Sequence, residues 1–334
     1  MSRLGAGLLL LTLLATCPAA AQEVRFTSGD VTLAGLLRRP SGTAPHPAVV
    51  LLPGSLATAK EDVRLAAVAA AFTARGFAVL TADSRGTGGS QGDFDRASLE
   101  LLAADAAAAV AMLRQRPDVR AAAVGLWGVS QGASWVGPLA AQRSTAAFLV
   151  AASGPLLSPE DFVHRFFAAK LRNEQKLDEP TIERIAAARR AVWSYFATGR
   201  GYEAASQAVE ALRREPWFAS SGLPPTVRPP GEPTAQPART RTFLAQKDFD
   251  PVAAIAGLPC PALFVYGAED TQLPVAEHAA TLRAFAPRAK AGITVEIVPG
   301  VDHDLRPTSG GTDNEALLRM ARWAEAQVAG SPGR

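Results

Sequence analysis

Short runs of consecutive apolar residues alternate along the chain with longer stretches of helical character. The apolar runs lie at 48–52, 78–81, 123–127, 147–151, 262–266 and 293–298, and the helical stretches at 62–75, 99–114, 131–143, 275–285 and 314–328. A run that is apolar at every position is what a strand buried on both faces requires. The alternation therefore predicts an α/β protein with a mostly parallel sheet that has helices on both faces.

Two segments depart from this alternation. Residues 24–27 and 31–37 are short alternating runs joined by Gly29 and Asp30, which predicts a β-hairpin. Residues 158–248 contain helical stretches at 159–172, 181–196 and 202–214 and then a proline-rich run at 223–237, which cannot be a regular helix or a central strand. We therefore predict a core at 22–157 and 249–334, with an insertion at 158–248 between its sixth and seventh strands.

The first 21 residues have the layout of a secretory signal peptide. Arg3 supplies a positive charge, residues 4–15 are a short apolar run, and residues 19–21 are small, as at a cleavage site. The run is too short to span a membrane stably, so an uncleaved anchor is a minor alternative, as is a lipid on Cys17. We expect a secreted or periplasmic protein that begins at Gln22 and keeps only Cys260, a small buried thiol, which excludes an intramolecular disulfide.

Composition and charge exclude several classes of function. Apolar residues make up 48% of the chain and charged residues 19%, which is the composition of a globular protein with ample material for a core. The formal net charge is +3 and the charges are scattered, whereas a nucleic-acid-binding protein needs a clustered basic face. The four histidines are dispersed and have no metal-ligand spacing, so we expect neither a metal nor an organic cofactor.

A candidate nucleophile follows the apolar run at 123–127. Gly128, Ser130 and Gly132 form a Gly-x-Ser-x-Gly pattern between a predicted strand and a helical stretch. Such a turn leaves no room for side chains beside the serine, and the start of the helix places its positive end beneath a reacting carbonyl. A plain glycine-rich strand–helix turn is the alternative, since this chain's glycine and serine content makes a chance match a real risk. The strand–turn–helix context favours Ser130 as the nucleophile.

The order expected on such a sheet is serine, then carboxylate, then histidine. His46 precedes Ser130, His164 lies in the insertion, and His278 lies in a helical stretch where we expect it at the surface. His303 instead lies in the loop after the last predicted strand, at the sheet edge where catalytic groups emerge. We therefore predict His303 as the general base that takes the serine proton and returns it to the leaving group.

Two carboxylates, Glu269 and Asp270, follow the seventh predicted strand. Asp270 is favoured because it lies fully past the strand, and Glu269 is the alternative. The role of this carboxylate is to fix the tautomer of the imidazole and to stabilise the imidazolium. Asp302 and Asp304 flank His303, but sequence neighbours rarely point at each other's ring, so we expect them to be solvated.

Two backbone N–H groups are needed to stabilise the oxyanion. We expect the first from Gln131, the residue after the nucleophile, and the second from Ser55, in the loop that follows the third predicted strand. A plain glycine turn at Gly54 is the alternative for that loop.

The chain resembles the α/β-hydrolase superfamily over residues 31–328, nearly its whole mature length. The resemblance rests on Pro53-Gly54-Ser55, the turn at 128–132, Tyr266-Gly267-x-x-Asp270, Gly300-x-x-His303, and the run Asp83-Ser84-Arg85-Gly86-Thr87-Gly88-Gly89-Ser90. The last run resembles the D-x-R-G-x-G-x-S turn of bacterial esterases, serine aminopeptidases and thioesterase relatives, in which it is mainly structural. Pro53 departs from the pattern, because many relatives have histidine there.

The resemblance implies an eight-stranded, mostly parallel sheet and a cap formed by residues 158–248 over the pocket. It also suggests that cap aromatics could line an acyl-binding pocket: Phe162, Phe166, Phe167, Trp193, Tyr195 and Phe196. Aromatic residues at helical spacing usually pack against one another, so we expect most of these to form the core of the cap itself.

The predicted reaction is the transfer of an acyl group from a small-molecule substrate to water through an acyl-enzyme on Ser130. A carboxylic ester is the leading substrate, and a peptide N-terminus is the second choice. A coenzyme A thioester is disfavoured for an exported protein, because that cofactor is cytoplasmic. A non-catalytic binding protein on the same scaffold would be expected to have a damaged triad or oxyanion loop, whereas every named position here holds a competent residue.

Overall fold

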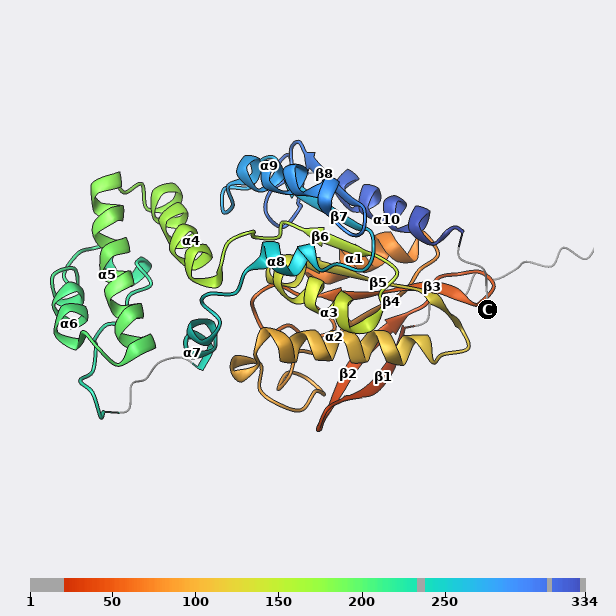
Figure 1. Ribbon diagram of the computed structural model, residues 1–334, viewed down its shortest axis with the longest axis horizontal. Helices are drawn as coiled ribbons and strands as arrows, with labels where there is room; N and C mark the ends of the chain where they lie inside the picture. The colour runs from red at the N-terminus through yellow and green to blue at the C-terminus, as the bar shows by residue number, and fades with distance from the viewer. Residues whose placement is uncertain (1–20, 233–237, 311–313, 331–334) are drawn as a thin grey trace, which may run out of the picture.

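One eight-stranded sheet organises the part of the chain that the computed structural model describes, residues 21–232, 238–310 and 314–330 (Figure 1). Its strands are β1 (Ala21–Ser28), β2 (Val31–Arg38), β3 (His46–Leu52), β4 (Ala78–Ala82), β5 (Val119–Val129), β6 (Leu149–Ala152), β7 (Ala262–Gly267) and β8 (Ile293–Val298). The order across the sheet is β1-β2-β4-β3-β5-β6-β7-β8, in which β2 is antiparallel to both β1 and β4 and all other neighbouring pairs are parallel. The predicted fold class is confirmed.

Helices cover both faces of the sheet. One face packs against α2 (Leu99–Arg114), α3 (Gly137–Ser144), α8 (Pro251–Ala256) and α9 (Val275–Phe285), and the other against α1 (Val63–Thr73) and α10 (Glu315–Val328). Single turns complete the core: η1 (Phe94–Arg96), the π-helical η2 (Gly132–Val136) and η4 (Ala286–Arg288).

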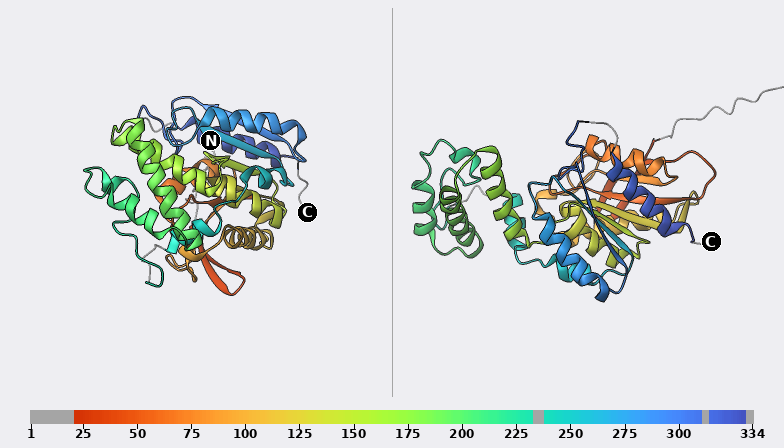
Figure 2. Two further views of the ribbon diagram at one scale, coloured as in Figure 1. Left: turned by 60° about the vertical axis from the view of Figure 1, so that its left-hand side comes forward. Right: turned by 90° about the horizontal axis from the view of Figure 1, so that it is seen from above.

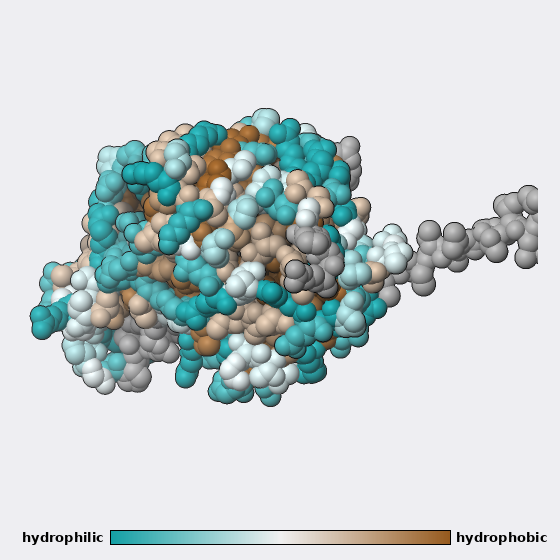
Figure 3. Space-filling view, turned by 45° about the vertical axis from the view of Figure 1, so that its right-hand side comes forward, coloured by the Kyte–Doolittle hydropathy of each residue, from teal (hydrophilic) through white to brown (hydrophobic). Residues whose placement is uncertain are grey.

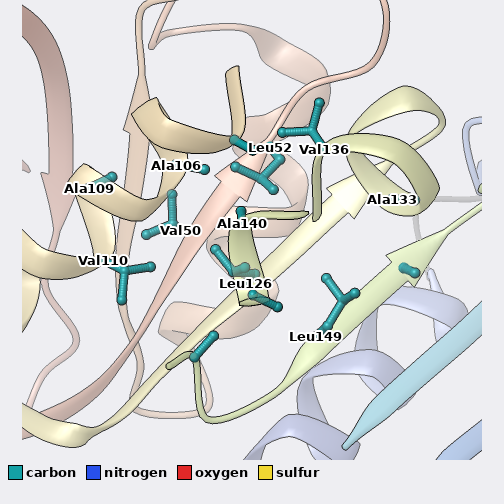
Figure 4. Close-up of a cluster of buried hydrophobic side chains, with 14 of the residues drawn as sticks. Val50, Leu52, Ala106, Ala109, Val110, Leu126, Ala133, Val136, Ala140 and Leu149 are labelled. Atoms are coloured by element: carbon teal, nitrogen blue, oxygen red, sulfur yellow. The ribbon is translucent and has the colours of Figure 1, made fainter. Parts of the chain in front are cut away.

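The apolar runs are continuous because both faces of each central strand are buried. In β3, Val50 and Leu52 belong to the cluster beneath α2 and α3, whereas Val49 and Leu51 belong to the cluster beneath α1 and α10. Figure 4 shows Val50 near small residues of α2 that let the helix approach the strands. Alternate side chains of residues 48–52 therefore point to opposite helix layers, and none of these five positions is exposed to water.

The segment between β6 and α8 forms a separate helical group at one side of the sheet (Figures 1 and 2). It contains α4 (Pro159–Glu174), α5 (Glu179–Thr198), α6 (Tyr202–Glu210), the turn η3 (Phe218–Ser220) and α7 (Ala238–Ala245). Residues of α4, α5 and α6 bury an apolar cluster of their own around Ile185 and Val209. Residues 221–232, within or just before the proline-rich run, form neither helix nor strand, and 233–237 lie outside the described residues.

The D-x-R-G-x-G-x-S turn after β4 is held by its own side chains. Asp83 accepts hydrogen bonds from the backbone N of Lys60 at 2.7 Å and of Gly89 at 2.9 Å. Arg85 donates two hydrogen bonds, of 2.6 and 2.7 Å, to the carboxylate of Asp105 in α2. Asp83 and Arg85 are both buried, so the turn joins the end of β4 to the neighbouring loop and helix, a structural role.

The N-terminal prediction falls largely outside the structure, since residues 1–20 of the predicted signal peptide lie outside the described residues. Among the residues that are described, no helix is both long and apolar enough to cross a membrane. The face of the molecule in Figure 3 carries hydrophilic residues over much of its area, with small hydrophobic areas between them.

Candidate active site

Ser130 lies on the tight turn between β5 and η2. Its φ is +52°, in the left-handed region that non-glycine residues rarely adopt. The backbone holds this conformation, because Ser130 N donates to Ala152 O at 2.9 Å and Ser130 O accepts from Ala133 N at 3.0 Å. A serine kept in such a conformation at the end of a central strand is typical of a nucleophile.

The two glycines of the turn are required by close backbone packing. A Cβ atom on Gly128 would lie 2.2 Å from Gly132 O, and a Cβ atom on Gly132 would lie 2.4 Å from Pro53 O. Both distances are far below a van der Waals contact, and the atoms that would be struck belong to the backbone. The Gly-x-Ser-x-Gly pattern thus lets β5, the turn and the loop after β3 approach one another.

His303 and Asp270 are brought together by the loops after β8 and β7. His303 Nδ1 lies 2.7 Å from Asp270 Oδ2, and the Asp270 side chain is fully buried. The other oxygen, Oδ1, accepts from the backbone N of Gln272 at 2.7 Å and of Leu273 at 3.1 Å. A carboxylate held in this way accepts a hydrogen bond from the Nδ1–H group, which leaves Nε2 of the neutral ring unprotonated and able to act as the base. Glu269, the alternative acid, is exposed.

The two loops are also joined by their backbones. Ala268 N donates to Val298 O at 2.8 Å, and Glu269 N donates to Val301 O at 3.0 Å. A Cβ atom on Gly267 would lie 2.3 Å from Val301 O, so a side chain there would push the loops apart. The distance between Asp270 and His303 is therefore set by the core of the protein.

Ser130 and His303 line the same pocket, which has a volume of about 950 Å³ and lies between the core and the helices of the 158–248 segment. This volume is typical of a site for a small molecule. Ser55 lines it too, and its loop passes beside the serine, since a Cβ atom on Gly54 would lie 3.6 Å from Ser130 Cβ. Within the described residues, no backbone hydrogen bond uses the N–H of Ser55 or Gln131, so both donors remain available for an oxyanion.

The wall of the pocket opposite the core is aromatic, which corrects one expectation. We expected most of the cap aromatics to form the core of the cap, but all except Tyr195 line the pocket: Phe162, Phe166, Phe167, Trp193 and Phe196. Tyr195 is buried in the cap, and its hydroxyl donates to Arg228 O at 2.8 Å. The prediction was wrong because α4 and α5 are apolar on more than one face, and the second face covers the pocket.

Several polar residues of the pocket wall were not predicted: Arg64, Arg189, Arg228, Gln272 and Asp304. Arg189 had a signal in the sequence, because it interrupts the apolar stripe of α5 at the position between Ile185 and Val192. A charged residue in such a stripe is either buried with a partner or placed beside a cavity. Asp304 was expected to be solvated, and it is exposed at this wall and paired with Arg306 at 3.4 Å.

The other titratable candidates do not line this pocket. Cys260 is buried, as predicted, and burial raises the pKa of its thiol to about 12, so it is unreactive at neutral pH. His46 lies at the start of β3, at the opposite end of the strand from the loop that carries Ser55. His164 packs on Trp193 with their ring centroids 5.3 Å apart, and burial lowers its pKa to about 4.

His278 is buried, which contradicts the expected surface position. It lies on the sheet-facing side of α9, its ring is 6.1 Å from that of Tyr266, and its Nε2 accepts from Leu156 N at 3.1 Å. Burial, with a smaller contribution from the charge of Arg165, lowers the pKa of this histidine to about 4. The ring is therefore neutral at pH 7 and links α9 to the segment after β6.

This burial predicts that stability falls as the pH is lowered. The unfolded chain binds a proton near the ordinary histidine pKa of 6.5, whereas folded His278 does not until about pH 4, so the free energy of unfolding decreases across that interval. In His278→Gln the amide oxygen can accept the Leu156 N–H, and the decrease should be smaller by up to about 1.4 kcal/mol per pH unit. Urea unfolding of both proteins at several pH values measures the difference, and identical slopes would contradict the prediction.

The fold and the site together define an α/β hydrolase of the serine-hydrolase type. The chain belongs to the X-Pro dipeptidyl-peptidase (S15) family, whose sequence profile matches residues 28–283. A curated relative, an uncharacterized 31.7 kDa protein of the Escherichia coli traX-finO intergenic region, is 33% identical over 105 residues. That match covers 31% of this chain and only 36% of the relative, about a third of its length.

Solved structures with little sequence identity share the fold. Est1E of Butyrivibrio proteoclasticus, solved with ferulic acid bound, is 18% identical with a TM-score of 0.57, over 92% of this chain and 99% of its own. An esterase of Pyrococcus furiosus is 17% identical with a TM-score of 0.59, over 92% and 91%. Proline iminopeptidase of Mycobacterium smegmatis is 18% identical with a TM-score of 0.58, over 93% and 100%. These neighbours include both esterases and a peptidase, so the fold leaves the substrate open.

Proposed function

We propose that the protein is a secreted or periplasmic serine hydrolase that cleaves carboxylic esters. The observation that carries the proposal is the 2.7 Å contact between His303 Nδ1 and a fully buried Asp270, with His303 and Ser130 lining one pocket. Ser130 is the proposed nucleophile, His303 the general base and Asp270 the acid that orients it. The N–H groups of Gln131 and Ser55 are the proposed oxyanion donors.

The steps follow from these roles. Ser130 Oγ attacks the ester carbonyl while His303 Nε2 takes its proton, and the tetrahedral oxyanion accepts hydrogen bonds from the two backbone donors. His303 returns the proton to the departing alcohol, which leaves an acyl group on Ser130. Water, deprotonated by the same histidine, attacks this acyl-enzyme and releases the acid. The chemistry requires no group beyond these residues.

The charge of the pocket favours an ester over a peptide N-terminus. A peptidase that reads a free N-terminus must bind an ammonium group, for which a carboxylate is the natural partner. Two guanidinium groups without a carboxylate partner among the described residues, on Arg189 and Arg228, line the pocket, whereas Arg64 is paired with Asp62 and the carboxylate of Asp304 with Arg306. Membership in the X-Pro dipeptidyl-peptidase family is the observation that supports the peptidase alternative.

A fluorophosphonate probe tests the nucleophile. We expect the probe to label the mature protein at Ser130, located by mass spectrometry, and to leave Ser130→Ala unlabelled. No label on folded wild-type protein would contradict the proposed function.

The proposed export is tested by the intact mass of the protein recovered from outside the cytoplasm. We expect the mass of a chain that begins at Gln22, because residues 1–21 are removed, and the mass of the full-length chain would contradict this.

Ala-Pro 4-nitroanilide, with a free or an acetylated N-terminus, distinguishes an esterase from a dipeptidyl-peptidase. We expect turnover of 4-nitrophenyl esters of medium-chain acids and little turnover of Ala-Pro 4-nitroanilide. A high rate on that anilide that disappears when its N-terminus is acetylated would identify a dipeptidyl-peptidase instead. Equal rates on the free and acetylated anilides would show that the pocket does not read the N-terminus.

A further inference from the structure

Arg189 is a buried cation in the wall of the candidate active-site pocket. It lies in α5, its side chain is only 3% exposed, and it lines the pocket together with Ser130. Its neighbours one turn away on the helix, Ile185 and Val192, are apolar and buried. A guanidinium in such surroundings loses most of its hydration, which is costly unless another group compensates.

The contacts of Arg189 within the protein are incomplete. Nη1 donates to Ser221 O at 2.9 Å, and the guanidinium carbon lies 3.8 Å from the centre of the Phe167 ring. Nε is buried and has no hydrogen-bond partner, and among the described residues no carboxylate lies within ion-pair distance. Burial lowers the pKa of the group only to about 10, so it is charged at neutral pH. The charge of this guanidinium is therefore met only by one backbone carbonyl and one aromatic ring among the described residues.

Nearby arginines show how unusual this is. Arg64, also in the pocket wall, donates to both oxygens of Asp62 at 3.0 and 2.8 Å, and its side chain is 45% exposed. Arg190, the next residue along α5, is 55% exposed and lies 3.9 Å from Glu183. The charge of each of these two arginines is compensated by water and a carboxylate. Arg189 is almost fully buried and has no carboxylate partner among the described residues.

We propose that Arg189 binds a carboxylate of the substrate, so that the enzyme prefers esters that carry a second, free carboxylate on an apolar chain. This inference rests on the proposed esterase function and specifies its substrate class. A carboxylate in the pocket would supply the missing negative charge and accept charge-assisted hydrogen bonds from the guanidinium. The aromatic rings of Phe166, Trp193 and Phe196 line the same pocket, so the part of the substrate between the ester and the carboxylate is apolar.

The substitution Arg189→Met tests this with two matched substrates. The mono-4-nitrophenyl ester of sebacic acid carries the free carboxylate, and its methyl ester is the neutral analogue with the same chain. We expect wild-type kcat/KM to be at least about tenfold higher for the acid, since charge-assisted hydrogen bonds of a buried pair contribute that much. Arg189→Met should lose at least about tenfold more kcat/KM on the acid than on the neutral ester, so that the preference disappears, and Arg189→Lys should retain part of it.

Arg190→Met is the matched control, because it removes the same charge from the same helix at a solvent-exposed position that does not line the pocket. It should leave the preference unchanged. Three results would overturn the proposal: no preference in the wild type, equal loss on both esters in Arg189→Met, or equal effects of the two substitutions. Absence of a preference in the wild type overturns the proposal even if Arg189→Met does not fold, and in that case Arg189→Lys, which keeps the charge but not the shape of the guanidinium, tests whether a preference depends on this residue.

Binding separates this proposal from the proposed catalytic function. Calorimetric titration of the protein with monomethyl sebacate requires no turnover, and we expect its Kd to rise at least about tenfold in Arg189→Met and to stay the same in Arg190→Met. Such binding without any ester hydrolysis would contradict the esterase and support the anion site. Ester hydrolysis with equal binding by the three proteins would support the esterase and overturn the anion site.

Discussion

The Ser130→Ala and His303→Ala variants are each expected to lose at least about 10⁴-fold in kcat on 4-nitrophenyl esters. Residues of such a triad act as a unit, so removing either one abolishes the acyl-enzyme route, and the double variant should lose little more. Asp270→Asn should lose about 10⁴-fold as well, because an amide can no longer fix Nδ1 as the donor of the 2.7 Å contact. Stopped-assay rates at substrate saturation measure these losses.

The control for these variants is their folding. The two alanine substitutions only remove atoms, and Asp270→Asn keeps the size of the side chain. The far-ultraviolet spectrum and the cooperative unfolding transition should therefore remain. Substantial activity in either folded single variant would show that the assigned residues are not the catalytic ones. An additive loss in the double variant would show that Ser130 and His303 do not act in one mechanism.

The second large effect concerns stability and the turn after β4. Arg85→Met should lower the free energy of unfolding by about 3–5 kcal/mol, because it leaves the carboxylate of Asp105 uncompensated in a site where it is only 14% exposed. The double variant Arg85→Met with Asp105→Leu should recover much of the loss. Urea denaturation of the two variants measures both changes.

A surface pair with similar geometry provides the control. Arg172 donates to both oxygens of Glu179 at 2.5 and 2.8 Å, but its side chain is 47% exposed and that of Glu179 is 62% exposed. Arg172→Met should therefore cost less than about 1 kcal/mol. If the losses in Arg85→Met and Arg172→Met were the same, burial would not be the cause.

The sheet and the candidate site could be predicted because each depends on local sequence. Continuous apolar runs locate strands that are buried on both faces, and β8 and α9 begin and end at the predicted residues. Ser130, Asp270 and His303 were identified because each follows the carboxyl end of a parallel strand, where the topology brings loops together. The short helix α8 was missed, although Asp250 followed by Pro251 is a signal for the start of a helix.

The cap could not be predicted to the same depth. Helical periodicity indicates that Phe166 and Trp193 are buried, but it does not tell whether the covering surface is another helix or a pocket. The same limit applies to His278, which lies on a helix whose inner face also contacts the segment after β6. The environment of Arg189 could not be predicted either, because it depends on contacts with Phe167 and Ser221, which lie in other segments of the cap.

The backbone hydrogen bonds between the loops after β7 and β8 have a consequence for how such an enzyme can change. The loops of the proposed acid and base are joined by backbone contacts of Gly267, Ala268 and Glu269, whereas the aromatic residues and Arg189 of the pocket wall belong to one continuous insertion. If the proposed function holds, the catalytic residues and most of the substrate-contacting wall are encoded in different stretches of the gene. Exchange of the stretch for residues 158–248 would then change substrate specificity and leave the catalytic residues in place.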